Sequence, residues 1–194
     1  MARLVEDSWD RIVVWLRRHA PASAAELGPP ATDDDLAIVE ALLGRTPPAD
    51  LRAWWRRSCG TSGSHRLLLM PRYTPYTIDE AVDSREVMLE VASAFSNDDT
   101  SLIAEPAGSP CTLWLPVWLP IADDGGGSYL FADLRQGPLH GCIMKWDKYE
   151  GAVGKPLWQG IAEMLAGIAD ALEHGMDVQG DRPEVCDDDT LDWV

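Results

Sequence analysis

The stretch that decides the fold runs from residue 118 to residue 146 and reads WLPIADDGGGSYLFADLRQGPLHGCIMKW. It predicts three short strands, because apolar runs alternate with clusters of glycine, proline and aspartate that are typical of tight turns. It contains no nucleophile beside a general base and no spacing typical of metal ligands. The pattern therefore favours a sheet that presents a surface over a catalytic site.

Alternate residues of the middle strand point to opposite faces of the predicted sheet. One face receives Tyr129, Phe131 and Asp133, and the other receives Leu130, Ala132 and Leu134. An aspartate at the end of a strand usually accepts hydrogen bonds from nearby backbone or pairs with an arginine. A catalytic carboxylate needs a second acid or a base nearby, and the sequence offers no distinctive one for Asp133.

The loop Asp123-Asp124-Gly125-Gly126-Gly127 admits three interpretations. A calcium loop needs acids at the later ligand positions and a closing glutamate, which this loop lacks. A phosphate-binding loop leads into a helix, whereas a strand follows here. We interpret the loop as a hairpin turn, in which glycine supplies positive φ and Asp123 accepts a backbone hydrogen bond. Its two aspartates remain candidates for the rim of a binding surface.

The length of 194 residues suffices for one domain with a substantial core, and 46% of the residues are hydrophobic, as in folded globular proteins. The chain contains nine tryptophans, whose default place is the core. A subset at the surface would suit partner binding, because tryptophan is enriched at interface hot spots.

The net charge is −16, and the acids are spread along the whole chain rather than confined to its end. Such a field repels nucleic-acid phosphates and anionic lipids, so we expect neither nucleic acid nor a membrane as the partner. It attracts basic proteins and speeds their association. The alternative interpretation is that the acidity only keeps the protein soluble.

The four cysteines lie far apart in the sequence, form no CxxC pair and have no histidine at ligand spacing: Cys59, Cys111, Cys142 and Cys186. We expect reduced thiols packed as small apolar side chains in a cytoplasmic protein, with no metal site and no cofactor. The first residues lack the apolar core of a signal peptide. No apolar run approaches the ~20 residues that a membrane span needs.

Helical periodicity flanks the central strands on both sides. Helices are predicted after a cap at Asp7 or Ser8, after a cap at Thr32, from the Pro47-Pro48 pair towards Gly60, and after a capping box at 77–80. A last amphipathic helix is expected to begin near Pro156 and to end at Gly175. The apolar run 67–70 predicts a buried strand.

The chain contains two composite motifs: Pro48-x-x-Leu51-x-x-Trp54-Trp55 followed by Cys59-Gly60, and 118–127 followed by Leu130-x-x-Asp133, Gly137-Pro138, Gly141 and Trp146. These motifs resemble the signatures of the SUKH superfamily, the yeast cell-wall-regulator and Syd-like group. The helix 158–172 occupies the place of the closing helix of the family, so the resemblance covers about residues 36–175. Cys59 stands where the family usually has asparagine, and Ser128 stands where aspartate or asparagine is common.

The resemblance implies a single α+β domain with a mixed or antiparallel sheet flanked by helices. On this basis the chain divides into an N-terminal helical extension (1–30), a SUKH-like domain (31–175) and an acidic flexible tail (176–194). The resemblance also implies a non-enzymatic, protein-binding role. Bacterial relatives are commonly immunity proteins that neutralise toxins, often nucleases.

We therefore expect a basic toxin domain as the partner, because an acidic protein can occupy the basic cleft that a nuclease presents to nucleic acid. The expected contacts are three acids near the turns and three aromatic anchors: Asp123, Asp124, Asp133, Trp118, Tyr129 and Trp146. Two alternatives stay open, a regulatory or scaffolding module and a metal-dependent hydrolase that uses Asp123 or Asp124.

Overall fold

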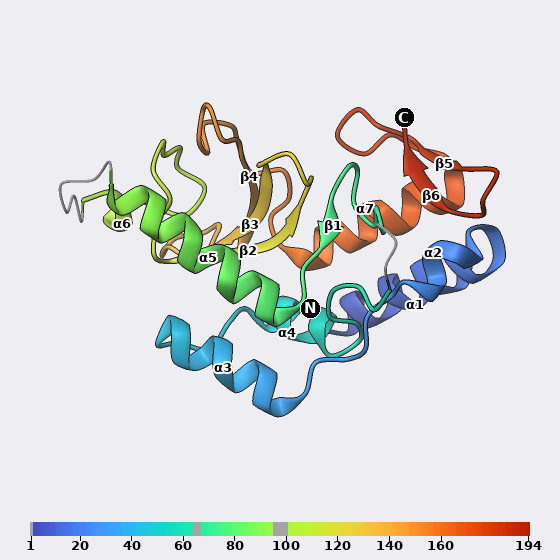
Figure 1. Cartoon of the computed structure of the whole chain (residues 1–194), viewed down its shortest axis with the longest axis horizontal. Coiled ribbons are helices and arrows are strands. Elements are labelled where there is room, and N and C mark those ends of the chain that lie inside the picture. Colours follow the sequence, from blue (N-terminus) through green and yellow to red (C-terminus); the bar gives the residue numbers. More distant parts are fainter. Residues whose placement is uncertain (1, 64–66, 95–100) are drawn as a thin grey trace.

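A four-stranded antiparallel sheet forms the centre of the domain (Figure 1). The computed structural model describes residues 2–63, 67–94 and 101–194. The strands follow one another across the sheet as β1 (Thr74–Pro75), β2 (Trp118–Asp123), β3 (Tyr129–Asp133) and β4 (Cys142–Trp146). The predictions of three strands within 118–146 and of an α+β fold are confirmed, and the sheet is antiparallel throughout.

The described residues form seven helices and a second, two-stranded sheet. The helices are α1 (Ala2–His19), α2 (Pro21–Ala25), α3 (Asp33–Leu43), α4 (Ala49–Trp55), α5 (Ile78–Ser93), α6 (Ser101–Ala104) and α7 (Ile161–His174), and the second sheet pairs β5 (Pro183–Val185) with β6 (Leu191–Trp193). Figure 1 shows α5 crossing in front of the central sheet above α3, and α1, α2, α7 and the β5–β6 hairpin grouped on the right.

Both faces of the central sheet are covered. Leu130 and Ile143 on one face belong to the main core, which also contains buried residues of α1, α4 and α7. Phe131 and Met144 on the other face belong to a second apolar cluster with Met88 of α5. The predicted alternation along β3 is therefore confirmed. The prediction that the sheet presents an open surface is wrong, because helices and loops bury both of its faces.

Two helices begin at capping boxes. Thr32 Oγ1 accepts from the backbone N–H of Asp35 at 3.2 Å, and the Asp35 carboxylate accepts in return from the backbone N–H of Thr32 at 2.7 Å. Thr77 and Glu80 make the same exchange at 3.2 and 2.7 Å. Each exchange satisfies two backbone donors that a helix start leaves open. These bonds fix where α3 and α5 begin, as predicted for both.

Two apolar segments differ from the elements predicted for them. Leu67, Leu69 and Met70 are fully buried, but this run contributes only the isolated bridge between Met70 and Tyr73 rather than a strand. The residues before α7 pair with β4 through Trp158, so the helix begins at Ile161 and not near Pro156. In the second case, pairing of the backbone with β4 replaces the predicted first turn of the helix.

The C-terminal segment differs from the expected flexible tail, because β5 and β6 form a hairpin that packs on the main core. Leu191 and Trp193 are 2% and 4% exposed. Trp193 Nε1 donates to the carbonyl of Leu68 at 2.9 Å, and the backbone N–H of Leu191 donates to Ser23 Oγ at 2.8 Å. Two inward apolar residues at alternate positions outweigh the acidic composition of the segment.

The N-terminal helix α1 is built into the same core as the sheet. Its inward face is fully or almost fully buried and consists of Val5, Trp9, Ile12 and Leu16. On its outer side, Arg11 Nη2 lies 2.6 Å from Asp170 and 2.5 Å from Glu173 of α7. Residues 1–30 are thus an extension in sequence but not a separate body in the described structure. The division into three segments stays a prediction.

Candidate protein interface

The three predicted aromatic anchors lie in the second apolar cluster, where they surround Trp114. The centroid of the Trp114 ring lies 5.6 Å from that of Trp118, 6.0 Å from that of Tyr129 and 5.4 Å from that of Trp146. Trp118 is fully buried and Trp146 is 8% exposed. Their rings pack edge to face inside the protein, which corrects the expectation that they are surface anchors. Tyr129 is half-buried and stays a candidate.

Asp133 is a structural residue at the end of β3. Its carboxylate is fully buried and pairs with Arg135, whose Nη2 lies 2.6 Å away. It also accepts from the backbone N–H of Gly108 at 2.8 Å, while Arg135 Nη2 donates to the carbonyl of Ser109 at 2.5 Å. The pair therefore ties the loop around residue 108 to the sheet. A partner cannot reach this carboxylate, which corrects its prediction as a contact residue.

The β2–β3 turn is a hydrogen-bonded loop, as predicted, and Asp124 accepts two of its backbone bonds. Asp124 Oδ1 accepts from the backbone N–H groups of Gly126 at 2.7 Å and Ser128 at 2.9 Å. Gly125 and Gly127 have positive φ angles of 69° and 98°, which glycine adopts without strain. Asp123 and Asp124 are half-buried, so they stay candidates for the rim of an interface.

The outer face of α5 carries a stripe of acids that the sequence analysis did not single out. The acids are all exposed and consist of Asp79, Asp83, Glu86 and Glu90. Their spacings of three and four residues place them on one side of the helix. We call these four residues the α5 stripe. The signal in the sequence is the recurrence of acids every three or four residues along 79–90.

The basic residue of α5 faces away from this stripe. Arg85 is 8% exposed and donates from Nη2 and Nε to the carbonyl of Pro116 at 2.5 and 3.2 Å. Burial lowers the pKa of the Arg85 guanidinium, because the charged form loses hydration. No ion pair within the described ranges involves a residue of the α5 stripe. The outer face therefore keeps its negative charge.

Apolar groups and further acids lie beside the α5 stripe. Val87 and Val91 are 56% and 50% exposed on the same helix. β1 pairs with the end of β2, matching Thr74 with Asp123, and leads directly into α5. The start of α5 and the β2–β3 turn consequently lie at one edge of the sheet. Together, α5 and the β2–β3 turn form a negatively charged surface that also exposes apolar side chains, a combination found in protein interfaces.

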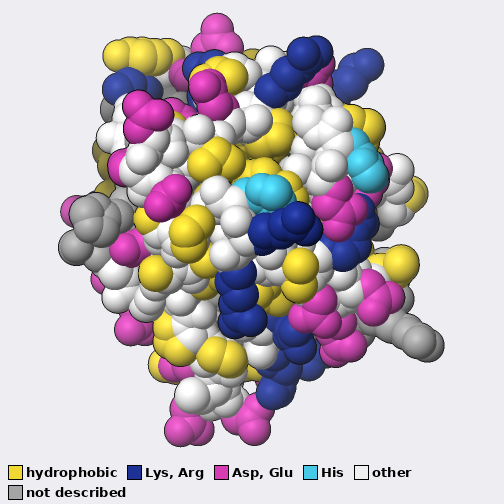
Figure 2. All heavy atoms as spheres, turned by 90° about the vertical axis from the view of Figure 1, so that its right-hand side faces the viewer, with side chains coloured by type: hydrophobic (Ala, Val, Ile, Leu, Met, Phe, Trp, Pro, Cys, Tyr) yellow, Lys and Arg dark blue, Asp and Glu magenta, His cyan; other side chains and the backbone are white. Residues whose placement is uncertain are grey.

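Positive charge gathers on a different side of the molecule. Figure 2 shows Lys and Arg side chains in a stripe down the face at the right of Figure 1, with Asp and Glu around it. The last turn of α1, which lies on that side, contains Arg17, Arg18 and His19. Positive and negative side chains are therefore distributed unevenly over the surface, although the net charge is −16.

The donor groups needed for a metal are not assembled in the part of the chain that the structure covers. Within the described ranges, no group of three or more histidine, cysteine, aspartate or glutamate side chains has metal-binding geometry. All four cysteines are free, and burial raises the pKa of Cys59 to about 11 and that of Cys142 to about 12. None of the helices described here has the length and apolar character needed to cross a bilayer.

A comparison with protein-family models matches the SMI1 / KNR4 family (SUKH-1) over residues 30–167. The matched range begins after α2 and ends within α7, so it includes the whole central sheet and α3 to α6. A search of curated proteins gives no match. The family match spans more than half of the chain and agrees with the resemblance in the stretch 118–146 and with the α+β fold. The chain therefore belongs to the SMI1 / KNR4 family (SUKH-1).

Proposed function

We propose that this protein is an immunity protein, which binds and blocks a basic toxin domain of the nuclease type in the cytoplasm and catalyses no reaction. The observation that carries the proposal is membership of the SMI1 / KNR4 family combined with a net charge of −16. A nuclease holds nucleic acid through basic residues, and an acidic protein competes for that surface. Electrostatic attraction also speeds the association of the two proteins.

The α5 stripe is the part of the surface that we assign to this contact. Its acids extend over about 16 Å of helix, from Asp79 to Glu90, at 1.5 Å per residue. They have no counter-charge within the described ranges, so a basic partner meets them unpaired. Val87 and Val91 add apolar area to the contact. Asp123, Asp124 and Tyr129 extend the proposed surface along the neighbouring edge of the sheet.

The proposal is tested by co-expression with the toxin encoded beside this protein. We expect cells to survive with the wild type, and the purified complex to dissociate as salt is raised, since exposed charge pairs are screened. Equal killing with and without this protein would contradict the proposed function. Capture of a partner that is not a toxin would support the regulatory or scaffolding alternative instead.

The surface assignment is tested by the triple variant Asp83→Asn, Glu86→Gln, Glu90→Gln. We expect about a tenfold or larger loss of affinity for the toxin, mostly as a slower association. The matched control neutralises three exposed acids on other elements, Glu6, Glu184 and Asp187. An equal loss in both variants would show that net charge acts alone and that α5 is not the contact surface.

A further inference from the structure

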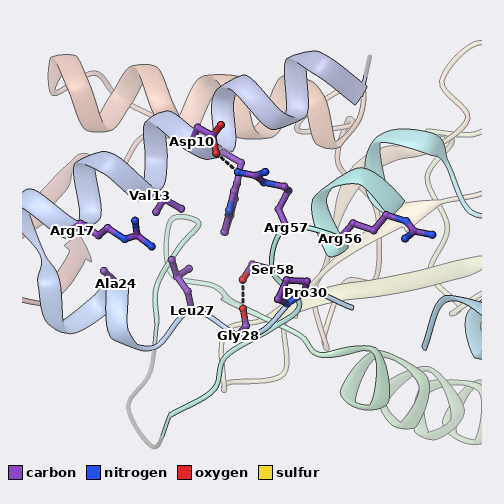
Figure 3. Close-up of a pocket in the computed structure, with 11 residues that line it drawn as sticks. Asp10, Val13, Arg17, Ala24, Leu27, Gly28, Pro30, Arg56, Arg57 and Ser58 are labelled. Atoms are coloured by element: carbon purple, nitrogen blue, oxygen red, sulfur yellow. Dashed lines mark hydrogen bonds and ion pairs between the residues drawn. The ribbon is translucent and has the colours of Figure 1, made fainter. Parts of the chain in front are cut away.

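A pocket of about 460 Å³ lies between the N-terminal helices and the end of α4 (Figure 3). Its walls come from α1, α2, the 27–30 segment and residues 56–58, which follow α4. The family match begins at residue 30, so α1 and α2 contribute walls from outside it. The volume falls within the range of small-molecule sites. The pocket is distinct from the α5 stripe and is not needed for the proposed function.

Three arginines line this pocket, in contrast to the acidity of the chain as a whole. They are Arg17 of α1 and Arg56 and Arg57 after α4, and Figure 3 shows all three among the pocket residues. Asp10 is the acid that lines the same pocket. The three cations therefore exceed the lining acids, although the whole protein carries −16.

The arginines retain donors for a ligand. Arg57 pairs with Asp10, and Arg56 pairs with Asp33 at 2.6 Å, each through Nη2. Nη1 and Nε of both side chains make no further hydrogen bond to the described residues, and neither does the guanidinium of Arg17. Arginine binds phosphate and carboxylate through two parallel N–H groups. Figure 3 shows the Arg56 side chain running away from the cavity, toward its partner Asp33 on α3. The guanidinium groups of Arg17 and Arg57 are therefore the ones that suit an anion with several oxygens, such as phosphate.

One side of the pocket is apolar and the backbone behind it is fixed. Val13, Ala24 and Leu27 face the cavity. The 27–30 segment is held by bonds from Gly28 N–H to the carbonyl of Gly60 at 2.9 Å and from Ser58 Oγ to the carbonyl of Gly28 at 2.9 Å. A preformed wall of this kind lowers the ordering cost of binding. It suits the ring of a ligand whose charged end meets the arginines.

Long-range charge restricts the size of the ligand. A polyanion such as nucleic acid extends beyond the pocket and meets the negative field of the protein. A small anion samples only the local positive potential, because charges farther than about 8–10 Å are screened in physiological salt. We propose that the pocket binds a small organic phosphate of the nucleotide class, with its phosphates at Arg17 and Arg57 and its ring against Val13 and Leu27.

The test is calorimetric titration of the full chain with ADP, pyrophosphate and citrate. We expect ADP to bind more tightly than pyrophosphate, because the ring contributes apolar burial, and citrate to bind least. Arg17→Gln is expected to weaken ADP binding about tenfold, the loss of one charge-assisted contact. NMR shifts of the Trp9 indole, which lines the pocket, give a second readout.

Arg18→Gln is the matched control, since Arg18 is the exposed neighbour on α1, carries the same charge and does not line the pocket. It is expected to leave ADP affinity within about twofold of the wild type. Three results would each overturn the proposal: no binding of ADP, equal weakening by the two variants, or citrate binding as tight as that of ADP. Thermal unfolding of both variants checks that neither change disturbs the fold.

Discussion

The outer face of α5 and the pocket between α1 and α4 present opposite charge in the same acidic chain. The α5 stripe exposes four acids, and the basic residue of that helix, Arg85, is buried beneath it. The pocket is lined by three arginines, of which Arg57 pairs with Asp10 and Arg56 pairs with Asp33. The difference teaches that net charge alone does not describe what this surface can bind. One region favours a basic macromolecule, and the other favours a small anion.

An Asp–Arg pair with the same nitrogen–oxygen distance of 2.6 Å lies near each region. The Asp133–Arg135 pair is fully buried and anchors the loop around residue 108 on the α5 side of the sheet. The side chains of Arg56 and Asp33, beside the pocket, are 53% and 84% exposed. The same contact thus serves as a structural element in one region and as a loosely held surface pair in the other.

The largest expected effect comes from Asp133→Ala, which leaves the buried charge of Arg135 without a counter-charge. We expect a loss of about 3–5 kcal/mol in the free energy of unfolding. Asp33→Ala removes the exposed partner of Arg56 and is expected to cost less than about 1 kcal/mol. Urea denaturation of both variants measures the difference. Similar losses for the two would contradict the structural distinction between these pairs.

Hydrogen exchange of the Asp133→Ala variant locates the damage. We expect the first amides to lose protection to lie around Gly108, whose N–H donates to the Asp133 carboxylate. The wall of the pocket around Gly28 has no contact with this carboxylate among those described, so it is expected to open only with global unfolding. Loss of protection at both places together would show that the two regions unfold as one unit.

The second largest loss of stability is expected from Gly28→Ala in the wall of the pocket, where two backbone segments lie close together. A Cβ at residue 28 would overlap the carbonyl oxygens of Cys59 and Gly60. We expect a loss of about 1–3 kcal/mol, the usual cost of overpacking, and weaker ADP binding. Gly154→Ala is the control, because a Cβ there meets no atom within 4 Å. An undisturbed pocket in Gly28→Ala would contradict the rigid wall that we describe.

Local signals in the sequence predicted much of the framework. The turn chemistry of 123–127, the alternation along β3 and the capping boxes at Thr32 and Thr77 depend on neighbours in the chain, and the structure contains them all. The α+β fold class was implied by the family resemblance, which rests on the motifs within 48–60 and 118–146 and on the helix 158–172. The end of the last helix was also predicted from a local signal, Gly175, which has a φ of 64° in the structure.

The site could not be predicted in the same way, because burial is decided by distant residues. A strand with aromatic residues on one face looks alike whether that face is open or covered, and here α5 and Trp114 cover it. The C-terminal segment was expected to be a flexible tail because it is rich in acids. Leu191 and Trp193 nevertheless find places in the core beside α2 and residue 68. The burial of the strand face and the burial of the C-terminal residues both depend on residues that are distant in the sequence.

A smaller effect is expected from neutralising the α5 stripe itself. Glu86 lies three residues from Asp83 and four from Glu90, and like charges at these spacings each cost about 0.2–0.5 kcal/mol. The triple variant Asp83→Asn, Glu86→Gln, Glu90→Gln is therefore expected to gain about 0.5–1 kcal/mol of stability at low salt. Because salt screens the repulsion, the gain is expected to shrink as salt is added. A loss of stability at low salt would show that these acids have stabilising partners.

The smallest expected effect concerns Asp177, which follows α7 and, unlike the acids of the α5 stripe, pairs with an arginine. Arg182 Nε donates to Asp177 Oδ1 at 2.7 Å, and this bond holds the pKa of Asp177 below its usual range. The stability from this pair is present above the unfolded pKa, about 3.9, and is lost as pH falls through the lower folded pKa. Arg182→Gln is expected to return the pKa of Asp177 towards the ordinary value, as followed by carboxyl NMR titration. Arg18→Gln, which removes the same charge from α1, is expected to leave that titration unchanged. If both variants move the pKa of Asp177 equally, the general field of the protein and not the paired guanidinium sets it.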